Sequence, residues 1–235
     1  MLAALHSADL ALLLAANRLV GLHDGLDVLF RVFNNNTVWM GGPILFSLVY
    51  LWFSDGARHR AAVARGLVAV IVATTLSVFS QSSLHVHLRP LTDPALAPQL
   101  RLGNLHLKEM WHHKNSFPSD TATLYFSAAA VVALESLPLG LLSLFWAAIS
   151  GGLVRIACGW HYPSDIAGGI LLGAGLVWLA SRSARLTEST TWLIRRAEKR
   201  EPLLHAALFL FLADLSTRFA GLQTVAKGLQ QLLHL

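Results

Sequence analysis

The feature that most constrains this chain is a series of long segments that contain no Asp, Glu, Lys or Arg. Five such segments cover residues 32–54, 66–88, 121–134, 136–154 and 166–181. A helix rises about 1.5 Å per residue, so the longer segments reach the roughly 30 Å thickness of the hydrocarbon core of a bilayer. The pattern therefore predicts an all-α, polytopic membrane protein in which these segments form five membrane-spanning helices.

The composition of the whole chain supports a membrane protein. Hydrophobic residues make up 54% of the 235 residues and charged residues 13%, whereas soluble domains carry about 25% charged residues. These values exclude a disordered chain, a fibrous repeat and an ordinary soluble enzyme. The net charge of +5 is not gathered into a continuous basic face, so we expect no nucleic-acid partner. The single cysteine, Cys158, excludes an internal disulfide, and the N-terminus lacks the basic residues of a cleaved signal peptide.

The other parts of the chain flank a membrane core of residues 32–181. Residues 1–31 contain an apolar stretch, 10–22, that is interrupted by Asn17 and Arg18. It predicts either a sixth, short membrane segment or an amphipathic interfacial helix. Residues 182–235 begin with a basic linker, and the apolar stretch 202–213 predicts a C-terminal amphipathic helix. We therefore expect five to six membrane helices.

Lys and Arg residues in the connections predict the orientation of the helices. Short basic loops face the cytoplasm, and two basic regions, 55–65 and 182–200, fall on the same side when five helices cross the membrane. The connections 89–118 and 155–165 then lie together on the outer, periplasmic or extracellular face of the cell (inner) membrane. The 89–118 loop is itself basic, contrary to the usual bias, which suggests that its charges hold an anion.

His161 and Asp165 are the first candidates for chemistry on the outer face. They are four residues apart, and Asp165 lies near His161 if Pro163 begins the last spanning helix. A carboxylate on one imidazole nitrogen leaves the other as a nucleophile or base, and Arg155 adds a fixed cation. Such groups are costly at a membrane boundary unless they have a function. The alternative is an interfacial anchor in which the neighbouring aromatic residues form a belt.

Two further clusters on the same face carry groups suited to phosphate. Ser119 follows Pro118 and precedes an apolar helical run, so it is a good N-cap, and the free N–H groups near Asp120 suit an anion. Arg89 precedes Pro90 and offers the bidentate guanidinium that binds phosphate. Taken alone, each cluster has a plainer interpretation: a helix start for Ser119 and an interfacial arginine for Arg89.

The order Arg-Pro, Pro-Ser and Arg-x5-His-x3-Asp resembles the type 2 phosphatidic acid phosphatase (PAP2) family, whose soluble relatives include vanadium-dependent haloperoxidases. The resemblance covers residues 32–181, and the stretch SFPSDTATLYFSAA looks most like the bacterial undecaprenyl-diphosphatase branch. It implies a helical membrane core, a phosphohistidine intermediate, and no metal or other cofactor. The implied site residues are His161 as the nucleophile, Asp165 as the group that orients it, and Arg89, Arg155, Ser119 and Asp120 as the positions that hold the phosphoryl oxygens.

Two positions depart from the family's motifs. Ser82 stands where the family has a Lys, and Thr121 where it has a His that protonates the leaving group. Thr does not donate a proton at neutral pH. Three explanations stay open: an impaired member that binds lipid phosphate, an engineered substitution, or a diphosphate substrate whose phosphate leaving group, with a second pKa of about 6, departs without an acid. His112, His113 and Lys114 in the outer loop are candidate substitutes for the missing groups.

Together these observations predict a membrane lipid phosphatase or phosphotransferase that acts on a polyprenyl diphosphate of undecaprenyl type through a phosphohistidine. The alternative is a catalytically impaired PAP2-like protein that binds or transports a phosphorylated lipid. Five histidines within residues 85–113 also allow a divalent-metal site, but their spacing is not diagnostic, and we expect no metal. The expected partners are the bilayer and an isoprenoid or other phosphorylated lipid.

Overall fold

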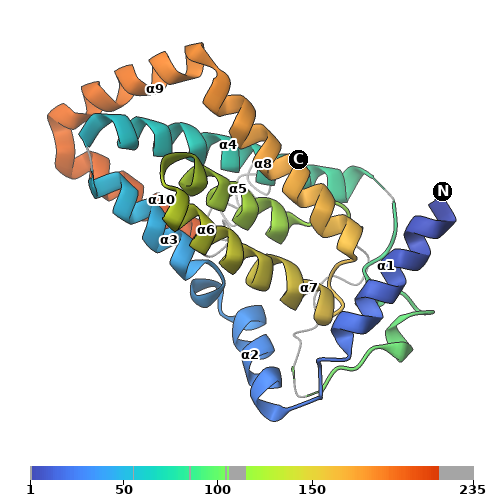
Figure 1. Ribbon diagram of the computed structural model, residues 1–235. Coiled ribbons are helices and arrows are strands. Elements are labelled where there is room, and N and C mark those ends of the chain that lie inside the picture. Colours follow the sequence, from blue (N-terminus) through green and yellow to red (C-terminus); the bar gives the residue numbers. More distant parts are fainter. Residues whose placement is uncertain (1, 55, 85, 104, 106–114, 217–235) are drawn as a thin grey trace, which may run out of the picture.

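The computed structural model describes residues 2–54, 56–84, 86–103, 105 and 115–216, and within them the chain is all-helical (Figure 1). These residues form no β-strand, and an isolated antiparallel bridge joins Leu88 to Asn115. The all-α class predicted from the uncharged segments is therefore confirmed. Large apolar side chains, among them Phe46, Phe79 and Phe145, stay exposed on the helices. Such an apolar surface is typical of a protein that faces lipid.

The helices of the first half are α1 (Leu2–Asn17), α2 (Asp24–Asn35), α3 (Thr37–Ser54) and α4 (Gly56–Ser83). The uncharged run 32–54, predicted as one helix, is instead divided between α2 and α3, which meet at an angle of 63°. The cause is Asn36, which leaves the helical conformation with φ −112° and ψ 101°. Its side-chain oxygen accepts hydrogen bonds from the N–H groups of Val38 and Trp39, so it ends one helix and caps the next.

The helices of the second half are α5 (Asp120–Glu135), α6 (Leu137–Ala147), α7 (Val154–Ala157) and α8 (Pro163–Arg182). A π-helical segment, η3 (Ala148–Leu153), joins α6 to α7 without a break. Two short 3-10 turns, η1 (Pro90–Thr92) and η2 (Ala97–Gln99), lie in the connection between α4 and α5. Ser136 alone separates α5 from α6, so these two helices are adjacent.

Three helical segments are long and apolar enough to cross a membrane: His59–Ser83 within α4, Leu137–Ala157 and Pro163–Arg182. The pair α2–α3 gives a fourth crossing if it counts as one bent span. The five crossings predicted from the uncharged runs are thus not reached among the described residues. The difference lies in α5, which has 16 residues. At about 1.5 Å per residue it is roughly 24 Å long, too short by itself for a hydrocarbon core of about 30 Å.

α5 is the central helix of the bundle and contacts α4, α6 and α8 (Figure 1). α8 approaches it closely through two glycines. A Cβ atom on Gly169 would lie 2.7 Å from the carbonyl oxygen of Ser119, and one on Gly173 would lie 2.6 Å from that of Thr123. Small residues permit such close approach between helices in a membrane. The contact brings together the N-termini of α5 and α8, which bear candidate site residues.

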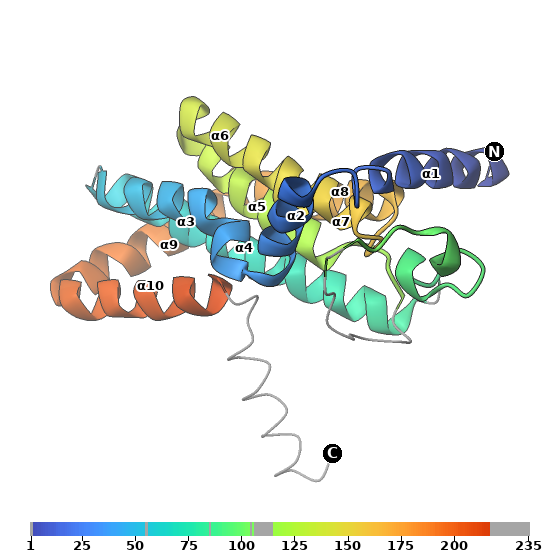
Figure 2. The same ribbon diagram turned by 90° about the horizontal axis from the view of Figure 1, so that it is seen from below.

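The chain after Arg182, expected to begin as a basic linker, forms α9 (Ala184–Ala197), a 3-10 turn, η4 (Glu198–Arg200), and α10 (Glu201–Ser216). Contacts with α4 hold this region in place, because the guanidinium of Arg60 lies 3.2 Å from Glu198 and 3.1 Å from Glu201. The two basic regions 55–65 and 182–200 therefore lie at the same end of the bundle. Figure 2 shows α9 and α10 at the end opposite to α1 and the segment 90–103.

The two outer segments also differ from the expected ones. The apolar stretch 10–22 is helical only to Asn17, whose side chain turns inward and donates hydrogen bonds to the carbonyl oxygens of Arg101 and Ala157. α10 contains the predicted stretch 202–213, but it carries apolar residues on its exposed side, such as Phe209, as well as on its buried side, such as Leu212. It is therefore apolar on both sides rather than amphipathic.

Candidate active site

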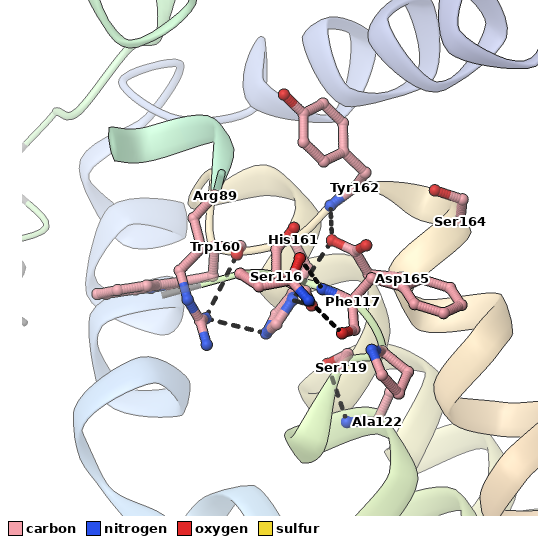
Figure 3. A network of polar contacts seen from close by, with 12 residues as sticks. Arg89, Ser116, Phe117, Ser119, Ala122, Trp160, His161, Tyr162, Ser164 and Asp165 are labelled. Atoms are coloured by element: carbon pink, nitrogen blue, oxygen red, sulfur yellow. Dashed lines mark hydrogen bonds and ion pairs between the residues drawn. The ribbon is translucent and has the colours of Figure 1, made fainter. Parts of the chain in front are cut away.

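The candidate site lies where the end of α4 and the N-termini of α5 and α8 meet (Figure 3). The bridge between Leu88 and Asn115 draws together the two ends of the long connection between α4 and α5. Pro163 begins α8, and Oδ2 of Asp165 accepts a hydrogen bond of 2.8 Å from the N–H group of Tyr162. This capping at the start of α8 places His161, the residue before Tyr162, beside the beginning of α5.

That residue, His161, is fully buried, and its two ring nitrogens face different groups (Figure 3). Nδ1 lies 3.0 Å from the carbonyl oxygen of Ser116 and 3.5 Å from Oδ2 of Asp165. Both neighbours are hydrogen-bond acceptors, so Nδ1 carries the proton and Nε2 carries the lone pair. This is the tautomer that an attack by Nε2 requires.

Within the described part of the chain, two charged groups face Nε2 of His161. Nη1 of Arg89 lies 3.2 Å from this nitrogen, and Oδ1 of Asp120 lies 3.7 Å from it. Arg89 is only 7% exposed. Its guanidinium donates to the side-chain oxygen of Gln81 at 3.3 Å and to the backbone oxygen of Trp160 at 3.5 Å. A fixed guanidinium beside the lone pair forms an anion-binding position directly at the nitrogen that would attack.

Gln81, on the last turn of α4, is a site residue that the sequence did not identify. Its amide nitrogen donates to the carbonyl oxygen of Pro118 at 2.6 Å and lies 3.5 Å from Oδ1 of Asp120, while its oxygen accepts from Arg89. The neighbouring Ser82, at the position of the family's Lys, is exposed and hydrogen-bonds to its own helix. The sequence does carry one signal for Gln81. It is a lone carboxamide in an apolar helical run, and such a group needs a buried hydrogen-bond partner.

Ser119 is the N-cap of α5, and its hydroxyl accepts a hydrogen bond of 3.2 Å from the N–H group of Ala122. Its own N–H group donates to the carbonyl oxygen of Asp165 at 3.0 Å, which joins α5 to α8. The side chain of Ser119 thus serves to start the helix. The next N–H groups, those of Asp120 and Thr121, have no acceptor within the helix, as at every helix start, and this arrangement suits phosphate oxygens.

Thr121 is fully buried, and its hydroxyl has no hydrogen-bond partner among the described residues. It provides no acid in place of the family's His. The predicted substitutes His112, His113 and Lys114 lie outside the described residues. Within the ranges that the structure describes, no three His, Cys, Asp or Glu side chains are grouped as a metal site requires.

Arg155, predicted to hold phosphate, is connected to the site indirectly. It lies in α7, is 4% exposed, and donates through Nη1 to Oδ1 of Asn34 in α2 at 2.8 Å. Its guanidinium also lies over the ring of Trp160, 5.3 Å from the ring centroid. The second of these contacts links Arg155 to the site, because the backbone oxygen of Trp160 contacts Arg89.

His87, expected from the sequence only as one of five histidines that allow a metal site, is a second residue that the structure adds to the candidate site. Its Nε2 lies 3.4 Å from Oδ1 of Asp165, and its Nδ1 lies 2.8 Å from Oγ of Ser116. His161 contacts the same two residues, Ser116 and Asp165. The four residues therefore form a closed cycle of polar contacts on the Nδ1 side of the His161 ring. In extended backbone, alternate residues point to the same side. The spacing of two between His87 and Arg89 is therefore a sequence signal that His87 faces the site together with Arg89.

Two other ionisable groups near the site keep their protons at neutral pH. Burial raises the pKa of Tyr162 to about 12, and the carboxylates of Asp93, Asp165 and Asp9 shift it in the same direction. Burial also raises the pKa of Cys158 to about 12. The phenol is therefore a poor proton donor for a leaving group, and the thiol is not the thiolate that nucleophilic attack requires.

Comparisons with known proteins agree with this arrangement. The family model of the PAP2 superfamily matches residues 66–187, which include every site residue from Gln81 to Asp165. The bacitracin transport permease protein BcrC of Bacillus licheniformis is 33% identical over 130 residues, which are 55% of this chain and 59% of that protein. The chain thus spans less than two thirds of the length of this curated relative, and no solved structure matches. Because the matched region covers more than half of the chain and contains the whole site, the protein belongs to the PAP2 superfamily.

Proposed function

We propose that this protein is a membrane lipid phosphatase or phosphotransferase that acts on a polyprenyl diphosphate of undecaprenyl type through a phosphohistidine at His161. The observation that carries the proposal is the difference between the two sides of the His161 ring. Nδ1 has acceptors at 3.0 and 3.5 Å, while Nε2 faces the Arg89 guanidinium at 3.2 Å. A neutral imidazole whose lone pair points at an anion-binding cation is arranged for attack on phosphorus.

In the first step, Nε2 attacks the terminal phosphorus in line. The N–P bond forms as the bond from phosphorus to the bridging oxygen breaks, which releases a prenyl monophosphate. The Arg89 fork and the N–H groups at the start of α5 stabilise the charge on the equatorial oxygens. The carboxylate of Asp165 stabilises the positive charge that develops on the imidazole. Water then releases phosphate from the histidine, whereas a hydroxyl acceptor in its place gives a transferase.

Thr121 supports a diphosphate as the preferred substrate. Because this position carries no acid, the best substrate is the one whose leaving group needs a proton least. A monophosphate ester expels an alkoxide, which must be protonated, whereas a diphosphate expels a phosphate whose second pKa is about 6. The polar groups that hold the site together are buried between helices, and this placement at the end of an apolar bundle suits a lipid with a phosphorylated head.

The arrangement of charges supports an outward-facing site. The basic regions 55–65 and 182–200 meet at one end of the bundle, where Arg65 of α4 donates to the hydroxyl of Thr187 at 2.8 Å. The candidate site lies at the other end (Figure 2). Because basic ends of membrane proteins face the cytoplasm, we infer that the site faces the periplasmic or extracellular side of the cell membrane.

Phosphate release by the purified full chain in detergent tests this function. C15 and C55 prenyl diphosphates and the matching monophosphates are supplied separately, and inorganic phosphate is measured. We expect the diphosphates to turn over at least about tenfold faster than the monophosphates, because a phosphate with a second pKa of about 6 is a much better leaving group than an alkoxide. Tight binding without phosphate release would contradict the proposal. It would favour a binder or transporter of phosphorylated lipid.

Replacing His87 with Ala is expected to lower kcat on a diphosphate about tenfold, because it removes the imidazole that lies 3.4 Å from Oδ1 of Asp165 and holds this carboxylate in place. Without His87, Asp165 is held less firmly against the nucleophile. His87→Gln keeps a donor and should recover most of the rate, and KM should change little because His87 lies on the Nδ1 side of the His161 ring. Steady-state phosphate release measures both constants. An unchanged kcat in His87→Ala would contradict the positioning role.

A further inference from the structure

We propose that Asp120 is the proton donor to the leaving group and the base for the attacking water, in place of the histidine that Thr121 replaces. The inference rests on the proposed function and adds an acid–base residue to it. Asp120 is the first residue of α5, and its Oδ1 lies 3.7 Å from Nε2 of His161, on the side of the ring where phosphorus binds. Its side chain is 31% exposed, whereas that of His161 is fully buried. Asp120 therefore exchanges protons with solvent more readily than His161 does.

Of the residues that the structure describes, the other charged or titratable groups around the nucleophile do not fit this role. Arg89 stays charged and does not release a proton. Asp165 contacts Nδ1 of His161, and His87 contacts Asp165, so both groups lie on the side of the imidazole away from the leaving group. Among the described residues that face Nε2, Asp120 is therefore the side chain that is able both to give up and to take back a proton.

The hydroxyl groups near the site are also poor acids. The pKa of Tyr162 is raised to about 12, chiefly by burial. Thr121 is fully buried, and an aliphatic hydroxyl does not donate its proton at neutral pH. Among the described residues, the position next to Thr121 carries a carboxyl group on the substrate side of the imidazole.

The charge of the substrate favours the protonated form of Asp120. A phosphate held by Arg89 brings negative charge close to the carboxyl group, and a like charge nearby raises the pKa of an acid. The amide nitrogen of Gln81 lies 3.5 Å from Oδ1 and holds the carboxyl group toward the site. Substrate binding and protonation of Asp120 therefore favour each other.

The atoms and protons of both steps balance. In the first step the N–P bond forms and the bond from phosphorus to the leaving oxygen breaks, while the proton passes from Asp120 to that oxygen. In the second step the oxygen of water bonds to phosphorus and the N–P bond breaks, while the carboxylate takes a proton from the water. Each turnover thus returns Asp120 to its protonated form and His161 to its neutral form.

This role determines which substrates depend on Asp120 most. An alkoxide leaving group must receive a proton, whereas a phosphate leaving group departs without one. Asp120 therefore decides whether the enzyme also accepts monophosphate lipids. Because only the protonated carboxyl group donates, turnover of a monophosphate should fall as the pH rises, and more steeply than turnover of a diphosphate.

The test compares wild-type full chain with Asp120→Asn on a C15 prenyl monophosphate and on the C15 diphosphate labelled with ³²P at its terminal phosphorus. We expect kcat to fall at least about 100-fold on the monophosphate but less than about tenfold on the diphosphate. Labelled phosphohistidine should accumulate from the diphosphate, because the base for the second step is missing. Asp120→Glu keeps a carboxyl group and should retain part of the monophosphate activity.

Asp24→Asn is the matched control, because Asp24 is the first residue of α2 as Asp120 is of α5. It removes a carboxylate from the same position of a helix and should leave both rates unchanged. Thermal melting of both variants in detergent then separates an effect on the helix start from an effect on chemistry. A loss of activity in Asp120→Asn with a melting temperature equal to that of the control supports the proposal.

Thr121→His in the Asp120→Asn background completes the test. If the two positions are alternative sites for one acid, the double variant should recover monophosphate turnover by about tenfold or more. Equal losses on both substrates, no loss on either, or no recovery in the double variant would overturn the proposal. So would the same substrate-dependent loss in a His112→Gln, His113→Gln variant. A wild-type protein that forms no phosphohistidine would instead overturn the proposed function itself.

Discussion

Replacing His161 with Gln is expected to reduce phosphate release from a prenyl diphosphate by at least about 10⁴-fold, because removal of the nucleophile from a covalent mechanism costs that much or more. Nε2 is the atom that would bond to phosphorus, and its neighbours Arg89 and Asp120 do not replace it as nucleophiles. Labelled phosphohistidine should disappear as well. Initial rates of phosphate release and acid-labile ³²P in the quenched protein measure the two effects.

His205→Gln is the control for this variant. His205 lies in α10, with its ring against Phe53 at 4.8 Å, and Figure 2 shows α10 at the end of the bundle opposite to α1 and the segment 90–103. It should retain the wild-type rate. Because His161 is buried and contacts the Ser116 carbonyl oxygen, thermal melting must show that His161→Gln is folded. A folded His161→Gln protein with a tenth of the wild-type rate would refute the role of His161 as nucleophile.

Replacing Arg89 is expected to lower kcat/KM about 100-fold for Lys and about 1,000-fold for Ala, in the range found when one donor to a developing oxyanion is removed. The guanidinium reaches Gln81 through Nη2 and His161 through Nη1 at the same time. A lysine ammonium is a single point of charge and does not reproduce this fork. Steady-state rates over a range of lipid concentrations give kcat and KM separately.

Separate values of kcat and KM show whether Arg89 acts in the transition state or only in substrate binding. If it stabilises charge that grows in the transition state, kcat should fall together with kcat/KM. A rise in KM with an unchanged kcat would restrict Arg89 to ground-state binding. Arg185→Lys is the matched control, because Arg185 is exposed in α9 at the opposite end of the bundle, and it should leave both constants unchanged.

The parts of the site that depend on local geometry were predictable from the sequence. His161 and Asp165 are four residues apart across a helix start, so their spacing alone brings them to within 3.5 Å. Ser119 precedes an apolar run, and it caps α5. The uncharged segments predicted the all-α class, because each has few ways other than a helix to satisfy its backbone in an apolar surrounding.

The residues that escaped prediction depend on contacts between distant segments. Gln81 and Ser82 are adjacent in sequence but point about 100° apart on a helix of 3.6 residues per turn. Only the rotation of α4 against α5 decides which of them faces Pro118 and Arg89. His87 likewise acquires its role from Ser116, which lies on the far side of the long connection.

The helical class, the position of the charged clusters and the pairing of His161 with Asp165 are predictable without a structure, because they follow from hydropathy and from spacing within one turn. Packing between distant segments decides that Arg155 contacts Asn34, that Gln81 accepts a hydrogen bond from Arg89, and that Asp120 faces Nε2 of His161. A buried polar group must find its hydrogen-bond partner wherever packing places one. In this bundle the partners come from α2, α4, α5 and α8, and only the packing of these helices brings them together.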